Sequence, residues 1–292
     1  MFHADYVAPA SLEELLSVLH HHGGEAKIIA GGTDLIPQMR LGKLYPRMLV
    51  DPQRLPSLGI SETSQSIGLG ACLTHTQVIN SSLMQREYPA LVDTCHQIGG
   101  PPVRNRGTLV GNLANASPAA DSALPLLVYD AQVITASLDG ERVIPLPEFY
   151  IGPGQTRLAV NEFIREIRVP KFSTRAKAVF IKLGNRKAMA IAVASIAVRL
   201  SLNELGQISE ARIALGSVAP TPVRAYHAEA ILQSNPLNDE TIFAAANAAQ
   251  QAASPISDLR ASAGYRSKMV AVLTRRALQV ISRELSQGDA YV

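Results

Sequence analysis

The chain has 292 residues, of which 47% are apolar, so it can bury a substantial core and is not a disordered protein. This length predicts about two domains, at roughly 150 residues per domain. The formal net charge of +3 is small and the Lys and Arg residues are scattered, which argues against a nucleic-acid-binding protein.

The cysteines and the apolar runs indicate the setting in which the protein works. Cys72 and Cys95 are the only cysteines and are too far apart for a metal motif or a disulfide framework, so we interpret them as buried thiols in a reducing compartment. The first residues lack a basic start and a long apolar run, and no stretch approaches the roughly 18 apolar residues of a membrane span. The sequence predicts a cytoplasmic protein without a membrane span.

The N-terminal part of the chain is predicted to form an α/β unit. Ser11 with Glu14 three residues later is typical of a helix start. The elements that follow are a strand over 27–30, a turn at Gly31–Gly32, a helix over 34–41 and a strand over 48–51. A glycine turn between a strand and a helix is a common phosphate-binding arrangement.

The middle of the chain is predicted to contain strands, helices and one long loop. A strand from Ser66 leads to a helix that begins after Thr74, where Gln77 completes a capping pattern. The other expected elements are helices over 90–97 and 124–130 and strands over 132–137 and 142–145. The polar and small residues of 103–125 predict a functional loop, because loops of this length are rarely without a role.

The C-terminal part of the chain is predicted to be a separate α+β unit that begins near 170–175. Three apolar strands are expected over 178–183, 190–202 and 211–216. Three helices are then expected over 227–233, 239–253 and 264–286. Strands followed by helices favour helices packed on one side of an antiparallel sheet.

Three segments carry residues suited to binding an anionic cofactor. In Ile29–Leu35 (IAGGTDL), consecutive glycines let backbone amides approach a diphosphate, although such a turn taken alone is more often structural. In Arg104–Asn112 (RNRGTLVGN), the glycines offer amides and the arginines offer positive charge, although the loop could equally serve its own turns. Lys182 lies on a strand that leads into a basic turn, which could also be a solvated hairpin tip.

Together these segments resemble the FAD-binding medium subunits of the xanthine dehydrogenase family. The residues that carry the resemblance are AGGTDLIPQMR, RNRGTLVGNLANASPAAD, EFIREIRVP, FIKLGNRKAMAIA and the C-terminal SDLRASAGYRSKM. The resemblance covers nearly the whole chain. It implies an α+β fold, with a two-subdomain FAD-binding domain of the vanillyl-alcohol oxidase (PCMH) type over 1–172, divided at about residue 55. It also implies a C-terminal domain over 173–292 with a three-stranded antiparallel sheet and helices.

The resemblance also implies which residues bind FAD. Ile29, Ala30, Gly31, Gly32, Thr33, Asp34 and Leu35 would surround the pyrophosphate, and Thr108, Gly111 and Asn112 would line its second side. Asp121 would hydrogen-bond the sugar-like portion, Ile164 would pack against the cofactor, and Lys182 would lie in the flavin pocket. No residue is implied as a catalytic acid or base, and none as a metal ligand.

In this family the FAD subunit receives electrons from a [2Fe-2S] small subunit, while substrate is oxidised at a molybdopterin-binding large subunit. The resemblance therefore implies a relay that passes electrons to NAD or another acceptor. Many relatives carry an Asp where this chain has Ala190, so the acceptor stays open. Two cysteines are too few for the additional iron–sulfur cluster of the 4-hydroxybenzoyl-CoA reductase type.

Other functions remain possible from the sequence. The complex could oxidise a purine, nicotinate, an aldehyde or carbon monoxide, because that choice lies on another polypeptide. The chain could instead be a self-contained flavin oxidase or dehydrogenase, although its C-terminal part is small and poor in aromatic residues. A scaffold or nucleic-acid-binding protein without a flavin is the third class.

Overall fold

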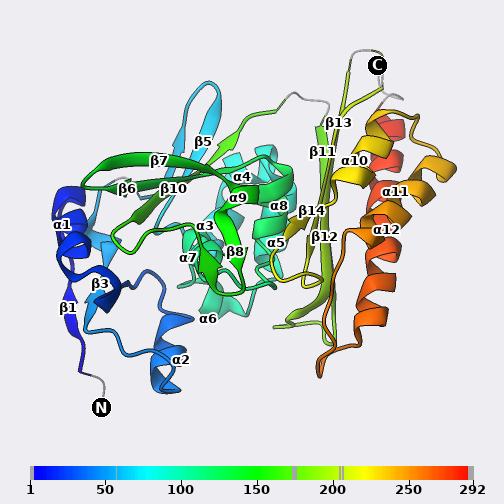
Figure 1. The fold of residues 1–292 in the computed structure, drawn as a ribbon. Coiled ribbons are helices and arrows are strands. Elements are labelled where there is room, and N and C mark those ends of the chain that lie inside the picture. Colours follow the sequence, from blue (N-terminus) through cyan, green and yellow to red (C-terminus); the bar gives the residue numbers. More distant parts are fainter. Residues whose placement is uncertain (1–2, 57, 173–175, 204, 206, 289–292) are drawn as a thin grey trace.

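We describe the protein from a computed structural model, which covers residues 3–56, 58–172, 176–203, 205 and 207–288 (Figure 1). Three main sheets follow one another along the chain, and each has its own cluster of buried apolar residues. No described helix is long and apolar enough to cross a bilayer.

The first sheet is parallel and has the strand order β1-β3-β2. Its strands are β1 (Asp5–Val7), β2 (Ala26–Ile28) and β3 (Met48–Val50). Helix α1 (Leu12–His22) packs Leu15, Leu16 and Leu19 into the core beside this sheet. The Ser11 hydroxyl accepts from the Glu14 amide as expected, but the Glu14 carboxylate accepts from the Ala10 amide. A complete capping box would have the Glu14 carboxylate accept from the Ser11 amide, so only half of the box is formed here.

The connections of this sheet position the first glycine segment. They contain the 3₁₀ turns η1 (Gly23–Glu25) and η2 (Pro52–Arg54) and the helix α2 (Leu35–Arg40). The Ile29 amide donates to the Val50 carbonyl, so the chain leaves the sheet directly into the turn at Gly31. The predicted strand–turn–helix order is confirmed here.

The second sheet has five antiparallel strands in the order β4-β5-β10-β6-β7. Its strands are β4 (Ile60–Glu62), β5 (Ser66–Gly70), β6 (Gln132–Ser137), β7 (Gly140–Pro145) and β10 (Phe163–Pro170). A separate hairpin pairs β8 (Tyr150–Gly152) with β9 (Gln155–Thr156).

Seven short helices accompany this sheet. They are α3 (His75–Asn80), α4 (Ser82–Glu87), α5 (Pro89–His96), α6 (Pro101–Arg104), α7 (Leu109–Ala114), α8 (Ala123–Val128) and α9 (Leu146–Phe149). Thr74 and Gln77 form the complete capping box that the sequence predicts. The expected long loop over 103–125 is wrong, because α6 ends inside it, α7 lies within it and α8 begins at its end. Proline at the first helical position, as in α6, starts a helix as readily as it stops one.

The third sheet is antiparallel in the order β11-β12-β13-β14. Its strands are β11 (Ala176–Gly184), β12 (Ala192–Leu202), β13 (Ile208–Gly216) and β14 (Val223–Arg224). The three long strands agree with the prediction. The fourth strand was not expected, because two residues are too few to show a pattern in the sequence.

Helices cover both faces of this third sheet. On the outer face lie α10 (Tyr226–Gln233), α11 (Asp239–Gln251) and α12 (Ala263–Gly288), as Figure 1 shows. The α12 residues Val270, Leu273, Ala277 and Ile281 are buried and Leu285 packs against them, as the helical spacing predicts. On the inner face, α5 and α8 of the first 172 residues contact β11, and α8 also contacts β12 and β13. The two parts of the chain therefore meet through α5 and α8.

Candidate functional site

Gly31 lies where two loops touch. A Cβ on Gly31 would stand 2.1 Å from the Arg106 carbonyl oxygen, so this position cannot hold a side chain. Gly32 has φ of +69°, a conformation that favours glycine. A Cβ on Gly107 would lie 3.3 Å from the Thr33 hydroxyl oxygen, so the loops also face each other there. The structure thus brings the first two predicted segments together.

The amides of the first loop suit an anionic group. Within the described part of the chain, the backbone amides of residues 30–34 donate no hydrogen bond. Asp34 stands at the N-cap of α2 without capping it, and burial raises the pKa of its carboxyl. Unpaired amides beside a glycine turn form a concave donor surface that fits a diphosphate. By this test the residues present fit the phosphate portion of a dinucleotide cofactor.

The second loop, residues 104–112, does not offer the free glycine amides that the sequence predicts. The Gly107 amide donates to the Val103 carbonyl at 2.6 Å, and the Gly111 amide donates to the Thr108 hydroxyl at 3.0 Å. The Asn112 side-chain oxygen accepts from the Ser122 hydroxyl at 2.6 Å. The expectation that these glycines offer free amides is therefore wrong. Thr108 and Asn112 instead fix the shape of the loop, which leaves the donor surface to residues 30–34.

The arginines of the second loop also differ from each other. The Arg104 guanidinium donates to the carbonyls of Ile98 and Gly99, both at 3.2 Å, so it stabilises the preceding turn. Arg106 is exposed and forms no ion pair with any described residue. Arg106, rather than Arg104, is therefore available to balance a phosphate charge.

A buried ion pair joins Asp121, which follows the second predicted segment, to Lys182 of the third. The Lys182 ammonium donates to the Asp121 carboxylate at 2.6 Å and to the Gln97 carbonyl at 3.1 Å. Each side chain of the pair is 6% exposed. Burial raises the pKa of the Asp121 carboxyl, and the ammonium of Lys182 opposes that rise. The pair can therefore present charge without water around it.

Ser195 is a site residue that the sequence reasoning missed. It stands opposite Lys182 in the pairing of β11 with β12, and its buried hydroxyl lies near enough to Asp121 to lower the pKa of that carboxyl. The geometry of a formed hydrogen bond is not reached, so the Ser195 hydroxyl and the Asp121 Oδ1 both remain without a partner. Buried polar atoms normally have partners. These two buried atoms lie beside the Lys182–Asp121 pair, and only the strand register could reveal that Ser195 belongs there.

The third loop completes the same edge of the molecule. Residues 184–191 connect β11 to β12, and the Arg186 guanidinium donates to the Met189 carbonyl at 2.6 Å. Met189 has φ of +53°, and its sulfur would lie 3.6 Å from a Cβ on Gly100 at the start of α6. This loop therefore reaches from the C-terminal sheet to the second loop.

Ile164 shares a core cluster with Leu109 and Val110 of the second segment. It lies on β10, is 4% exposed and belongs to the core of the second sheet, against which α7 packs. This core cluster includes no residue of 29–35. Its expected contact with a cofactor stays a prediction.

His75 and Cys95 form a buried pair behind the second loop. The Cys95 sulfur lies 3.6 Å from His75 Nδ1, and the His75 amide donates to the Gly107 carbonyl at 3.1 Å. Burial lowers the pKa of His75 to about 4 and raises that of Cys95 to about 12. Cys95 is thus the inert buried thiol that the sequence predicts, while Cys72 is only partly buried. No group of described residues has the make-up of a metal site.

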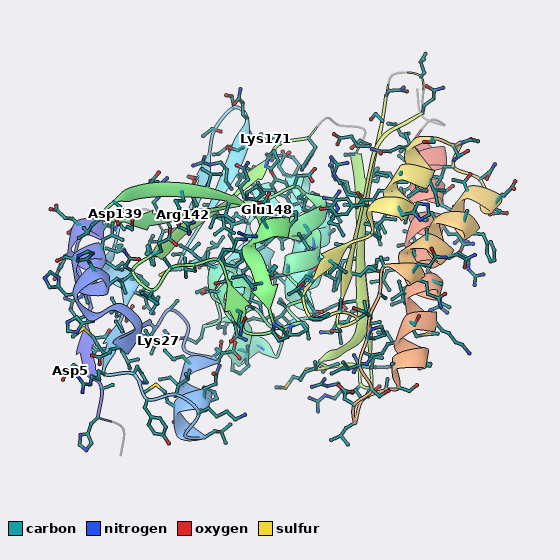
Figure 2. The ribbon with its side chains drawn as sticks, in the orientation of Figure 1. Asp5, Lys27, Asp139, Arg142, Glu148 and Lys171 are labelled. Carbon is teal, nitrogen blue, oxygen red and sulfur yellow. The ribbon has the colours of Figure 1, made fainter. Side chains whose placement is uncertain are left out.

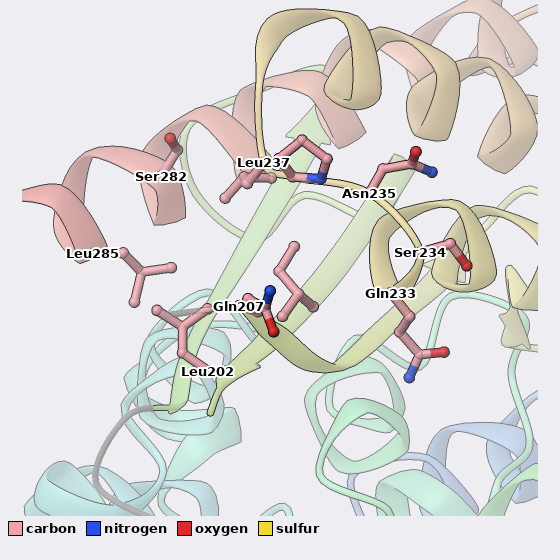
Figure 3. Close-up of a pocket in the computed structure, with 10 residues that line it drawn as sticks. Leu202, Gln207, Gln233, Ser234, Asn235, Leu237, Ser282 and Leu285 are labelled. Atoms are coloured by element: carbon pink, nitrogen blue, oxygen red, sulfur yellow. The ribbon is translucent and has the colours of Figure 1, made fainter. Parts of the chain in front are cut away.

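Pockets elsewhere on the surface do not coincide with this edge. One of about 510 Å³ lies between the ends of β12 and β13, the α10–α11 connection and α12 (Figure 3). Its lining includes Leu202, Leu237 and Leu285 with amide side chains such as Gln207. None of its described lining residues is charged, so these residues offer no cation for a diphosphate.

Comparison with known proteins gives matches over almost the whole chain. Residues 1–172 match the family described as the FAD binding domain in molybdopterin dehydrogenase. Residues 180–281 match the CO dehydrogenase flavoprotein C-terminal domain.

Individual relatives are similar over their full length. The alpha subunit of the 6-hydroxypseudooxynicotine dehydrogenase complex of Paenarthrobacter nicotinovorans is 36% identical, with 94% of this chain and 93% of that protein covered. The xanthine dehydrogenase FAD-binding subunit of Escherichia coli O157:H7 is 34% identical, with 94% of each covered. A solved structure of carbon monoxide dehydrogenase from Hydrogenophaga pseudoflava superposes with a TM-score of 0.91 at 35% identity, covering 94% of this chain and 96% of that one.

Proposed function

The chain belongs to the FAD-binding subunits of the molybdopterin dehydrogenases, and we propose that it relays electrons from an iron–sulfur subunit to an acceptor. It is an oxidoreductase flavoprotein whose relatives are medium chains or subunits of dehydrogenase complexes. The observation that carries the proposal is the meeting of three loops at one edge: residues 30–34 with their unpaired amides, the second loop against Gly31, and the loop after β11, whose Met189 lies against Gly100. The buried Lys182–Asp121 pair lies just before that third loop.

Each group at this edge has a part in holding the cofactor. The amides of residues 30–34 would bind the diphosphate, and Arg106 would offset its charge. Asp121 has one carboxylate oxygen without a partner, which would accept a hydrogen bond from the sugar-like portion, and Lys182 would lie beside the flavin. Thr108, Gly111 and Asn112 would act by fixing the loop, and Ile164 would pack against the cofactor from the core.

Bound FAD supplies a ring that exchanges one or two electrons, which suits a relay between one-electron and two-electron partners. The protein contributes binding, orientation and electrostatics. The Lys182–Asp121 pair is desolvated, so its positive end at the Lys182 ammonium would favour negative charge beside it more strongly than an exposed pair would. We therefore assign Lys182 the role of raising the reduction potential of the flavin.

The proposed partners are a [2Fe-2S] small subunit as electron donor and a molybdopterin-binding large subunit where substrate is oxidised. Relatives of similar identity are named for 6-hydroxypseudooxynicotine, carbon monoxide and xanthine. These relatives are named for different substrates yet match this chain over almost its whole length, which favours substrate choice on another chain. We propose NAD or another acceptor as the destination of the electrons, and the cytoplasm as the location.

The fold supports a finer assignment. We propose that the first two main sheets are the two subdomains of a vanillyl-alcohol oxidase (PCMH) type domain over 1–172, with the third sheet and its helices forming the domain over 173–292. The three-loop edge then lies where the two subdomains and the C-terminal domain meet.

A glycine substitution tests whether this edge binds FAD. Gly31→Ala would drive a Cβ into the Arg106 carbonyl, so we expect the two loops to separate and the FAD content of the purified chain to fall by about tenfold or more. Gly24→Ala is the matched control, since the nearest atom to its Cβ would be 4.0 Å away. FAD released on denaturation is measured for each variant. Full FAD content in folded Gly31→Ala would show that the cofactor lies elsewhere.

A further inference from the structure

Helix α8 is shared between the two parts of the chain. All six of its residues are buried, and it contacts β11, β12 and β13 of the C-terminal sheet. Asp121 stands just before the helix and Asp130 just after it. Each of these aspartates pairs with a cation of the C-terminal sheet. The position of α8 is therefore set at both ends by side chains of the other domain.

At the C-terminal end of α8, a side chain of the sheet donates a hydrogen bond to a backbone carbonyl of the helix. Carbonyl groups in the last turn of a helix lack partners within the helix. The Arg199 Nε on β12 donates to the Val128 carbonyl at 2.7 Å. Arg199 is 1% exposed, and its guanidinium carbon lies 4.0 Å from the centre of the Phe172 ring. Removing a partner of such a buried guanidinium leaves an uncompensated charge and destabilises the fold.

Asp130 forms ion pairs with three arginines at the C-terminal end of α8. Its carboxylate accepts from Arg199 and Arg212 at 3.0 Å and from Arg224 at 3.1 Å. The remaining positive charge is offset by Glu210 and Glu229, which belong to the C-terminal domain like the arginines. Asp130 therefore makes the ionic link that crosses between the domains at this end.

The opposite end of α8 carries the pair at the proposed flavin site. Asp121 Oδ2 accepts from Lys182 on β11, the neighbour of the strand that carries Arg199. A hydrogen-bonded helix with all its residues packed moves as a unit. A shift between α8 and the sheet at Asp130 would therefore change how Asp121 meets Lys182.

We infer that Asp130 is a positioning residue for the flavin site: by binding three arginines at one end of α8, it holds Asp121 against Lys182 at the other. This inference rests on the proposed function, because it takes the Lys182–Asp121 pair as part of the FAD site. Without the Asp130 charge, three guanidinium groups would face two carboxylates, and the sheet would move away from the end of α8.

The test is Asp130→Asn in the FAD-loaded full chain. Asp130 has φ of +49°, which asparagine also tolerates, so the change removes the charge and leaves the backbone conformation accessible. We expect the Kd for FAD to rise about tenfold, as for residues coupled in one network, and the flavin reduction potential to shift. Arg212→Gln, which removes one of the three partners at a partly exposed position, should give a smaller change in the same direction.

Glu162→Gln is the control for loss of stability alone. The Glu162 carboxylate is also buried and accepts from Arg142, labelled in Figure 2, and from Thr135. It lies in the first 172 residues, and its hydrogen bonds to described residues all stay within them. We expect this variant to unfold at a lower temperature with unchanged FAD affinity and flavin potential.

The outcomes separate this inference from the proposed function. If Asp130→Asn and Arg212→Gln both keep the wild-type Kd and potential while Gly31→Ala loses FAD, the positioning role is overturned and the site stands. If Gly31→Ala also keeps FAD, the proposed site itself fails. If Glu162→Gln matches Asp130→Asn in its loss of FAD affinity, the effect is one of general stability and the positioning role is likewise overturned.

Discussion

The individual residues of the site differ in how far the sequence could predict them. Gly31 was singled out, but the reason it must be glycine, the Arg106 carbonyl 2.1 Å from its would-be Cβ, depends on a residue 75 positions away. Ser195 lies in an apolar run that reads only as a buried strand. Arg199 lies in the same run, and nothing in the sequence near it indicates that it reaches Asp130. Long-range contacts of this kind are set by the packing of the whole fold.

His75 gives a prediction at this scale. Its pKa is lowered to about 4 in the folded protein, whereas an unfolded histidine titrates near 6.5. Between these values the unfolded chain binds the extra proton, so the stability from neutral His75 is fully present above about pH 6.5 and is lost as pH falls toward 4. We expect about 3 kcal/mol less stability at pH 4 than at pH 7 from this group.

The measurement is urea unfolding at several pH values, for the wild type and His75→Gln. Glutamine fills a similar space but does not titrate, so the difference in unfolding free energy between the two proteins should change over this pH range. Parallel pH profiles would show that His75 does not carry the effect.

At the scale of elements, most helices and strands could be predicted because each carries its own signal. Thr74 with Gln77 marks the start of α3, and the apolar spacing from Val270 to Ile281 marks the buried face of α12. The segment 103–125 could not be predicted, because its small and polar residues serve short helices whose apolar faces are only one turn long. Short elements are stabilised by their neighbours rather than by local pattern.

Thr108 gives the prediction for this scale. Its buried hydroxyl accepts from the Gly111 amide and so caps α7. Thr108→Ala should lower the free energy of unfolding by about 1 kcal/mol, the usual cost of a lost N-cap, and should also weaken FAD binding because the loop facing Gly31 loosens. Thermal unfolding and FAD titration measure the two effects. Ser81→Ala, which removes the hydroxyl that accepts from the Met84 amide and caps α4, is the matched control.

At the scale of the whole molecule, the resemblance seen in the sequence led directly to the family, and the full-length matches confirm it. The sequence could not indicate that α8 joins the two parts through ion pairs at both of its ends. The position of the Lys182–Asp121 pair on this join means that the proposed site depends on the contact between domains. A relay of this kind needs partners but no substrate pocket of its own.

The reduction kinetics of the bound flavin test this central claim most directly. The FAD-loaded chain is mixed without oxygen with xanthine, nicotinate, carbon monoxide or an aldehyde, and flavin absorbance is followed by stopped flow. We predict no reduction by any of these compounds, but rapid reduction when the chain is mixed with its [2Fe-2S] subunit that has been reduced by dithionite and then freed of the excess reagent. Rapid reduction of the isolated chain by an organic substrate would contradict the account and would make the protein a self-contained flavin dehydrogenase.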